Sequence, residues 1–347
     1  MPYGGDTAGE NPMSTAHAPV SFAELHAVLK AAGETTRLRV LTLLAEAELT
    51  VSDLTEILRQ SQPRISRHLK LLAGAGLVER FREGSWAFFR LADRALAAEV
   101  TRGLLARLDP ADPTIVRDHE RLAAVRATRA AAAQAYFRAH AAEWDRIRQL
   151  HVADAAVEAA IREALAERPF RSLLDLGTGT GRMLELFGPH IERGLGIDLS
   201  HAMLAIARSR LERAGLRHVS VRQGDIYDLA LPRDSFDVVL IHQVLHYLDD
   251  GARAIAEAAR VLRPGGRLLV IDFAPHDLEF LREEHAHRRL GFAAEAVSQW
   301  MTAAGLDVVA HRTLPPDAGS AGKIAVSLWL ARDPRLVLAE PATREVA

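Results

Sequence analysis

Residues 173–181 read Leu173-Leu174-Asp175-Leu176-Gly177-Thr178-Gly179-Thr180-Gly181, and this stretch decides the fold of the second half of the chain. Its apolar first part predicts a buried strand, and a helical segment, MLELFG, follows the glycines. Glycine is needed where the backbone takes a positive φ or where a ligand must approach it without a Cβ in the way. The stretch therefore predicts a ligand-binding turn, although its glycine spacing alone is a weak signal, because dinucleotide-binding enzymes use a related turn.

Two acidic residues further along the chain make this signal more specific. Asp198 lies in Gly196-Ile197-Asp198-Leu199-Ser200, at the end of the next predicted strand, where a carboxylate can accept both hydroxyls of a ribose. Asp225 follows a further strand, and its carboxylate can accept a proton from an exocyclic amine of a base. Open α/β sheets bind their ligands at the carboxyl ends of the strands, which is where all these residues lie. We therefore expect a site for a nucleoside-containing ligand.

Seven short apolar segments alternate with amphipathic helices between residues 169 and 335. The segments are RSLLDL, RGLGIDL, HVSVRQ, FDVVLIH, GRLLVIDF, LDVVAHR and KIAVSLWLA. This alternation is typical of a parallel-rich sheet with helices on both faces. We predict an α/β, Rossmann-like domain with a seven-stranded sheet.

The ordered set DLGTGTG, GIDLS, HAMLAIAR, GDIYDLALP, FDVVLIHQVLHYLDD and LRPGGRLLVID resembles the class I S-adenosylmethionine-dependent methyltransferases over about residues 172–331. It looks most similar to the ubiquinone/menaquinone-biosynthesis branch, which acts on small molecules. The resemblance implies S-adenosylmethionine as the cofactor and a small-molecule methyl acceptor. It implies a cofactor site formed by Asp175, Gly177, Thr178, Gly179, Gly181, Asp198, Leu199, Met203, Asp225, Ile226, His242 and Gln243.

Within that site, the resemblance places the methionine part of the cofactor at residues 177–179 and the ribose at Asp198. Leu199, Met203, Asp225 and Ile226 would surround the adenine, and His242 and Gln243 would lie beside the methyl group. The class of enzyme that methylates arsenic is disfavoured, because its members share thiolate cysteines and this chain has none.

The residues that handle the acceptor are harder to predict. Methyl transfer is a direct displacement, so a base is required only if the nucleophile arrives protonated. His242 and His246 have the imidazole chemistry for this task and are the candidate catalytic residues. His276, Glu284 and His287 lie in the polar stretch 276–291 and are the candidate substrate residues, Glu284 and His287 on a shared helical face. A solvated or dimer-facing surface is the alternative for this stretch. No metal site is predicted.

Residues 109–168 are expected to form a linker and a helical lid. Asp109-Pro110-Ala111-Asp112-Pro113 breaks regular structure and marks the expected domain boundary. The helical stretch that follows occupies the place where similar methyltransferases cover their cofactor. Tyr136 and Trp144 are the lid candidates, and plain helix packing is the alternative for both.

Residues 21–108 show a different pattern, with four short helices followed by a hairpin around Glu83-Gly84 and a last helix at about 92–108. Between residues 59 and 90, seven basic side chains face two acidic ones, a basic patch of the kind that binds phosphates. The cations are Arg59, Arg64, Arg67, Lys70, Arg80, Arg82 and Arg90. This order of elements predicts a mainly α, winged helix-turn-helix domain.

The stretches ETTRLRVLTLL, ELTVSDL, SQPRISRHLKLLAGAGLVE and REGSWAFFRL closely resemble the ArsR/SmtB-like winged-helix repressors. The resemblance implies a double-stranded DNA operator as partner and a homodimer paired through the first and last helices. The expected DNA-binding residues are Gln62, Arg64, Ser66, Arg67 and His68 on the recognition helix and Arg80 and Arg82 on the wing. Thr50 and Ser52 replace the cysteines of the metal-sensing members, which excludes metal sensing through thiolates.

Length and composition agree with this division. The 347 residues suggest about two domains. The whole-chain charge of −2 combines a basic DNA-binding segment with the charges of the rest of the chain, so it does not describe either part alone. Residues 1–20 and 336–347 are expected to be tails, and the first of them lacks the features of a signal peptide. No apolar run is long enough to span a bilayer. We expect a cytoplasmic protein without a membrane partner.

Three hypotheses for function follow. The first is an enzyme that methylates a small molecule and also regulates transcription. The second is a transcriptional regulator whose methyltransferase fold only senses S-adenosylmethionine or S-adenosylhomocysteine. The third and weakest is that the DNA-binding fold serves only for dimerisation.

Overall fold

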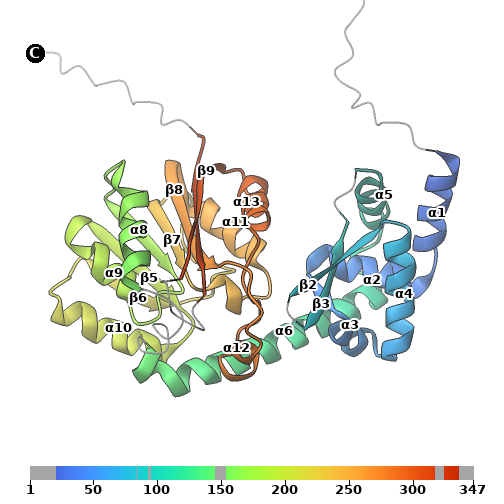
Figure 1. Cartoon of the computed structure of the whole chain (residues 1–347), viewed down its shortest axis with the longest axis horizontal. Helices are drawn as coiled ribbons and strands as arrows, with labels where there is room; N and C mark the ends of the chain where they lie inside the picture. The colour runs from blue at the N-terminus through green and yellow to red at the C-terminus, as the bar shows by residue number, and fades with distance from the viewer. Residues whose placement is uncertain (1–20, 84, 93–94, 145–153, 317–323, 336–347) are drawn as a thin grey trace, which may run out of the picture.

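The computed structural model describes residues 21–83, 85–92, 95–144, 154–316 and 324–335. Figure 1 shows two domains joined by one long helix, α6 (Pro113–His140), which runs from one to the other. The expected tails, 1–20 and 336–347, lie outside the described residues. In the part of the chain that the structure describes, no helix is long and apolar enough to cross a membrane.

The N-terminal domain is a winged helix-turn-helix, as the sequence predicted. Its helices are α1 (Phe22–Ala32), α2 (Thr35–Glu46), α3 (Val51–Leu58), α4 (Gln62–Gly74) and α5 (Ala95–Leu105). Its strands β1 (Leu49–Thr50), β2 (Val78–Glu83) and β3 (Trp86–Leu91) form an antiparallel sheet in the order β1-β3-β2. The hairpin β2–β3 is the wing.

Local signals explain where these helices begin. Ser21 and Thr50 each cap a helix through a capping box, with Glu24 and Asp53 as the reciprocal partners. Ser61 is the N-cap residue of α4, but its side chain makes no capping hydrogen bond. Pro63 is tolerated in the first turn of α4, where backbone amides have no intrahelical acceptor.

Helix α6 is part of both domains, so the segment after residue 113 is more than a linker. Near its start, Asp118 accepts two 2.6 Å hydrogen bonds from the Arg39 guanidinium of α2. Leu122 and Val125 are buried in the same hydrophobic cluster as the helices of the N-terminal domain. The later turns of α6 and η1 (Ala141–Glu143) lie against the C-terminal domain. The expected boundary at 109–113 remains a prediction, and it would cut these contacts.

The C-terminal domain has the predicted seven-stranded sheet, in the order β6-β5-β4-β7-β8-β10-β9. Its strands are β4 (Ser172–Leu176), β5 (Arg193–Asp198), β6 (Val219–Gln223), β7 (Phe236–His242), β8 (Leu262–Phe273), β9 (Asp307–Leu314) and β10 (Val326–Arg332). Strands β4 to β8 pair in parallel, and β10 pairs antiparallel with both β8 and β9.

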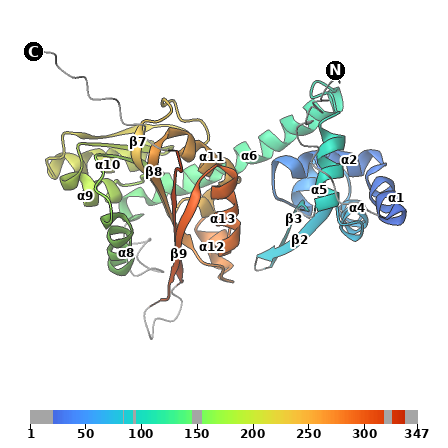
Figure 2. The same cartoon turned by 90° about the horizontal axis from the view of Figure 1, so that it is seen from above.

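Helices cover both faces of this sheet (Figure 2). One hydrophobic cluster joins the sheet to α8 (Asp154–Ala166) and α9 (Arg182–Phe187), and a second joins it to α11 (Gly251–Val261) and α13 (Ala294–Ala303). The remaining elements are α10 (His201–Arg213), α12 (Phe280–Glu284), η2 (Gly188–His190) and η3 (Leu245–Tyr247). This Rossmann-like arrangement leaves the carboxyl ends of β4, β5 and β7 open to a ligand.

Candidate cofactor and acceptor site

A cavity of about 360 Å³ lies at the carboxyl ends of β4, β5 and β7. It brings together every residue predicted to bind the cofactor except Gly181, which begins α9 instead. The predicted residues in its wall are Asp175, Gly177, Thr178, Gly179, Asp198, Leu199, Met203, Asp225, Ile226, His242 and Gln243. Residues far apart in the sequence therefore form one site, while their individual roles stay predictions.

The glycine-rich turn has the backbone conformation that its sequence requires. Gly177, Gly179 and Gly181 have φ angles of 70°, 52° and 80°, in the region that favours glycine. A Cβ at Gly177 would lie 2.8 Å from Cγ1 of Val244 and closer still to Cγ2, so this position has no room for a side chain. Behind the turn, the buried Asp175 accepts a 2.6 Å hydrogen bond from the Thr178 hydroxyl, which fixes the turn against β4.

Asp198, at the end of β5, holds the turn from the other side. One carboxylate oxygen accepts a hydrogen bond from the Gly179 amide at 2.9 Å, and the other accepts one from the Ser200 amide at 2.8 Å. Burial raises the pKa of Asp198 above its usual range, although these amide donors act in the opposite direction. A ligand that donated hydroxyl protons to this carboxylate would favour its ionised form.

This raised pKa predicts a pH-dependent affinity for the nucleoside part of a ligand. Hydroxyl donors need the carboxylate, so binding should weaken as the pH falls through the pKa of Asp198, by up to about tenfold per pH unit. Calorimetric titration with S-adenosylhomocysteine between pH 8 and pH 5 measures this slope. In Asp198→Asn, which cannot ionise, the affinity should be lower and the slope should disappear. An equal slope in both proteins would assign the titration to another group.

The expected adenine side of the cavity combines buried and exposed groups. Met203 and Ile226 are buried, Leu199 is more than a third exposed, and the exposed Asp225 accepts a 2.9 Å hydrogen bond from the Tyr227 amide. Gln243 has a φ of 56°, an uncommon value for a residue other than glycine. Among the described residues its buried amide nitrogen has no hydrogen-bond partner, so it can donate to a ligand in the cavity that it lines.

Aromatic side chains form another part of the cavity wall, and one of them lies at the glycine-rich turn, because a Cβ at Gly179 would lie 3.6 Å from Nε1 of Trp144. Phe137 of α6, Trp144 and Tyr247 contact one another, with ring centroids 4.8–6.4 Å apart. His287 lies beside Tyr247 at 5.1 Å, and burial raises the pKa of the Tyr247 phenol well above its usual value. The phenol is therefore neutral near pH 7. Of the lid candidates, Trp144 lines the cavity, whereas the Tyr136 hydroxyl hydrogen-bonds Nδ1 of His285 at 2.6 Å outside the wall.

The two candidate catalytic histidines occupy different environments. His242, at the end of β7, lines the cavity. His246 does not line it. Its side chain is buried, and its Nδ1 makes a 2.8 Å hydrogen bond to the carboxylate of Asp272, which is also buried. His246 therefore supports the wall from behind, where its ring packs at a tilt against Tyr247 and His287.

Only one of the three candidate substrate residues lines the cavity. His287 does so, but Glu284 is exposed at the end of α12, and His276 lies outside the wall. Burial lowers the pKa of His276 to about 4. The expected shared helical face of Glu284 and His287 is wrong, because α12 ends at Glu284 and His287 lies beyond it. Within the described residues, no group of three or more acidic or histidine side chains is placed to hold a metal ion.

The expected DNA-binding residues lie mostly on the free surface of the N-terminal domain. Gln62, Arg64, Ser66 and Arg67 are exposed on α4, opposite its buried Ile65 and Leu69. Arg80 and Arg82 are exposed on β2. His68 differs: its side chain is mostly buried, with Nδ1 3.5 Å from a carboxylate oxygen of Glu34. That contact turns it away from the exposed face of α4.

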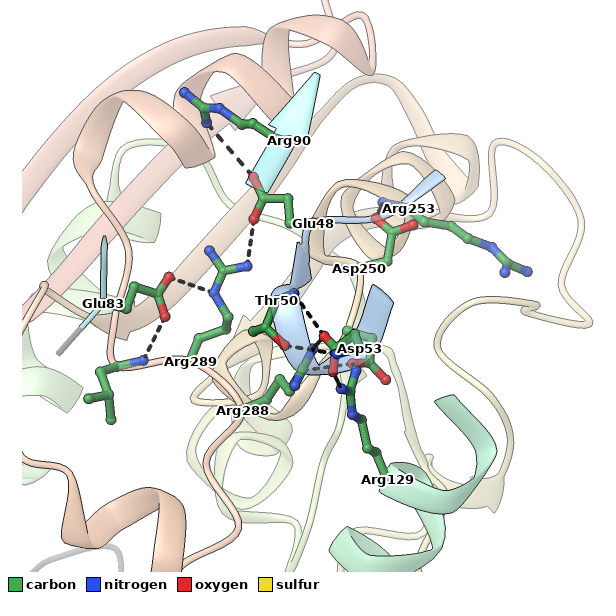
Figure 3. A network of polar contacts seen from close by, with 12 residues as sticks. Glu48, Thr50, Asp53, Glu83, Arg90, Arg129, Asp250, Arg253, Arg288 and Arg289 are labelled. Carbon is green, nitrogen blue, oxygen red and sulfur yellow. Dashed lines mark hydrogen bonds and ion pairs between the residues drawn. The ribbon is translucent and has the colours of Figure 1, made fainter. Parts of the chain in front are cut away.

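The other side of the wing is bound to the C-terminal domain (Figure 3). Glu83, at the end of β2, and Glu48, just before β1, both accept hydrogen bonds from the Arg289 guanidinium at 2.6 Å. Arg289 is buried, which by itself would lower its pKa, but the carboxylates of Glu83 and Glu48 outweigh this and raise it. Arg90, counted above in the basic patch, pairs with Glu79 and Glu48 instead of facing solvent alone.

A second ion-pair cluster ties the helix-turn-helix to the cavity wall. Asp53 of α3 accepts from Arg129 of α6 and lies 3.4 Å from the guanidinium of Arg288. Both arginines also pair with Asp249, at 3.2 Å and 2.8 Å. Arg129, Arg288 and Asp249 all line the cavity. The polar stretch 276–291, considered above as a substrate segment or a solvated surface, therefore faces the DNA-binding domain.

The fold and the cavity define an α/β domain with a nucleoside site, attached to a winged helix-turn-helix. Residues 34–80 match the family model described as the bacterial regulatory protein arsR family, and residues 174–270 match the model of a methyltransferase domain. Successive segments of the chain thus match an ArsR-family helix-turn-helix and a methyltransferase domain, as the sequence motifs indicated.

Curated relatives cover parts of this chain. The uncharacterized methyltransferase YcgJ of Bacillus subtilis is 30% identical over 41% of this chain and 58% of its own length. A demethylmenaquinone methyltransferase of Thermus thermophilus is 41% identical over 33% of this chain and 53% of its own. An uncharacterized 37.1 kDa protein in transposon TN4556 of Streptomyces fradiae is 42% identical over 35% of this chain and 36% of its own. The chain spans less than two thirds of each relative.

Solved structures also resemble it. A crystal structure from Thermotoga maritima, described as a possible histamine N-methyltransferase, covers 58% of this chain and all of its own, with 24% identity and a TM-score of 0.47.

Proposed function

We propose that this protein is an S-adenosylmethionine-dependent methyltransferase of a small molecule that is also an ArsR-type, DNA-binding transcriptional regulator. The observation that carries the enzymatic part is a cavity lined by both the glycine-rich turn and Asp198, whose carboxylate accepts a hydrogen bond from that turn. The residues present fit the cofactor: the turn has no room for a Cβ at Gly177, and the buried amide of Gln243 is available to a ligand. When bound, S-adenosylmethionine supplies an electrophilic methyl group.

The side chains of the cavity have separate tasks in this proposal. Residues 177–179 and Asp198 hold the methionine and ribose parts, and Asp225 with Ile226 holds the adenine edge. Phe137 and Trp144 exclude water from the cavity, where the positioning of the reactants supplies much of the rate. His242 is the proposed base if the nucleophile arrives protonated, because it lines the cavity, whereas His246 acts through its contact with His287 as a positioning residue.

For the DNA-binding part, we propose contacts from Arg64 and Arg67 to an operator, with Arg80 and Arg82 on the adjacent backbone. A homodimer fits the surface of α1, where Phe22, Leu25 and Leu29 form an exposed apolar row at helical spacing. Such a row is what pairing through the first helix would cover. The cytoplasmic location expected from the sequence remains a prediction.

A second candidate function is a regulator whose methyltransferase domain only senses S-adenosylmethionine or S-adenosylhomocysteine. It is favoured by α6, because Leu122 and Val125 belong to the core of the DNA-binding domain and Phe137 of the same helix lines the cavity. A ligand that binds one arrangement of α6 more tightly would change the affinity for DNA if DNA also prefers one arrangement. The coupling is reciprocal, so DNA would change the free energy of ligand binding by the same amount.

One pair of measurements tests both functions. Calorimetry should show one S-adenosylhomocysteine bound per chain, and mobility shifts with operator DNA should then be repeated at saturating ligand. Arg64→Ala with Arg67→Ala should weaken DNA binding and reduce its salt dependence, because two phosphate or base contacts are lost. Absence of S-adenosylhomocysteine binding would overturn the cofactor assignment. A shift in DNA affinity without methyl transfer to any compound of a metabolite extract would favour the sensor over the enzyme.

A further inference from the structure

One residue of the DNA-binding domain lines the methyltransferase cavity. Trp86, the first residue of β3, lines the cavity from the tip of the wing. Two contacts hold this tip in place: the Ser85 amide donates to the Glu279 carboxylate at 2.6 Å, and the Arg282 guanidinium lies over the Trp86 ring at 4.8 Å. The indole remains 39% exposed, so one of its surfaces is available to a ligand.

The wall of this cavity is rich in aromatic rings. Phe137, Trp144, Tyr247 and His287 belong to it besides Trp86. Flat rings prefer offset-stacked or edge-to-face partners, and such pairs gain affinity beyond the burial of their area. A wall with this many rings therefore favours a flat, aromatic occupant over a saturated one of the same size.

Three arginines of the cavity wall have their charges balanced by carboxylates. Arg129 and Arg288 are paired with Asp53 and Asp249, and Arg282 is paired with Glu83 at 3.2 Å and with Glu279 at 3.5 Å. A charged occupant would have to break one of these pairs in a partly desolvated place, which is costly. The wall therefore favours an uncharged occupant.

We propose that the wing residue Trp86 is a specificity-determining residue of the methyltransferase cavity, which takes a flat, uncharged aromatic molecule as its methyl acceptor. This inference rests on the proposed function, since it assigns the part of the cavity wall that includes Trp86 to the methyl acceptor. It also makes the DNA-binding domain a wall of the acceptor site, so the acceptor touches the wing directly.

The test uses 2-naphthol as the aromatic probe and 2-decalol as its saturated counterpart, with the full chain. S-adenosylhomocysteine is titrated first by itself, so that failure of the cofactor site is seen separately. With the cofactor end filled, 2-naphthol should bind more tightly than 2-decalol. Trp86→Ala should weaken 2-naphthol binding about five- to tenfold and leave the affinity for S-adenosylhomocysteine unchanged.

Two matched variants separate stacking from simple filling of space. Trp86→Phe keeps a ring and should retain most of the affinity for 2-naphthol, whereas Trp86→Leu keeps apolar bulk and should lose it. Thermal melting of each variant shows whether the wing is still folded. Equal binding of 2-naphthol by the wild type and by Trp86→Ala would overturn the proposal, as would equal binding of the two probes by the wild type.

Discussion

Arg289→Leu is expected to separate the two domains and to lower the free energy of unfolding by about 3 kcal/mol. The guanidinium of Arg289 is buried between Glu48 and Glu83 of the DNA-binding domain, with both hydrogen bonds at 2.6 Å. Its removal leaves two carboxylates close together in a partly desolvated interface, and an uncompensated buried charge costs more than the lost pair itself. Small-angle scattering should report a larger radius of gyration, and calorimetric melting should resolve two transitions in place of one.

A rescue variant tests this reason. When Glu48→Gln and Glu83→Gln are added to Arg289→Leu, the like charges disappear, and much of the lost stability should return. The control is Arg312→Leu, since Arg312 pairs with Glu163 at 2.8 Å but both side chains are more than half exposed. Exposed pairs contribute little, so this change should cost less than about 1 kcal/mol. Equal losses in Arg289→Leu and Arg312→Leu would show that the interface does not depend on the buried arginine.

Gly177→Ala is expected to lower the affinity for S-adenosylhomocysteine at least about tenfold. Two separate costs add at this position: a positive φ, which costs an L-residue about 1–2 kcal/mol, and a Cβ placed against the branched side chain of Val244. The turn can avoid the clash only by moving, and its movement also disturbs the Gly179 amide that donates to Asp198. Calorimetric titration measures the loss.

Gly215→Ala is the matched control for this change. Gly215 has nearly the same φ, 68°, but a Cβ there would meet nothing within 4 Å. Gly215→Ala should therefore lower the free energy of unfolding by about 1 kcal/mol and leave the affinity for S-adenosylhomocysteine unchanged. Adding Val244→Ala to Gly177→Ala should recover part of the affinity, because it removes the clash and leaves the φ cost. No recovery would mean that the backbone conformation alone accounts for the loss.

Much of the fold could be predicted because periodicity and turn chemistry are local. The capping role of Thr50, the hairpin around residues 83–84 and the seven strands of the sheet all follow from neighbouring residues. The cofactor end of the cavity could be predicted for a related reason: the carboxyl ends of parallel strands meet at one edge, so Gly177, Asp198 and His242 converge there.

The interface and the acceptor end could not be predicted in this way. Glu83 and Arg289 meet only because two domains pack together, and no spacing in the sequence indicates which surfaces meet. The sequence showed only that the hairpin and the polar stretch 276–291 carry charged residues. Charge alone does not distinguish a solvated surface from an ion-paired one. The prediction that Glu284 and His287 share a helical face was wrong for a local reason, because α12 ends before His287.

Helix α6 also affects how the protein is made. Leu122 and Val125 are buried in the core of the first domain, and Asp118 is paired with Arg39 in α2. A domain folds as a unit during synthesis, N-terminal part first. Here residues 118–125 of α6 must leave the ribosome before the first domain has its full core. Nascent chains that end near residue 108 would still lack these contacts, so the first domain completes its core only after the first half of α6 has been made.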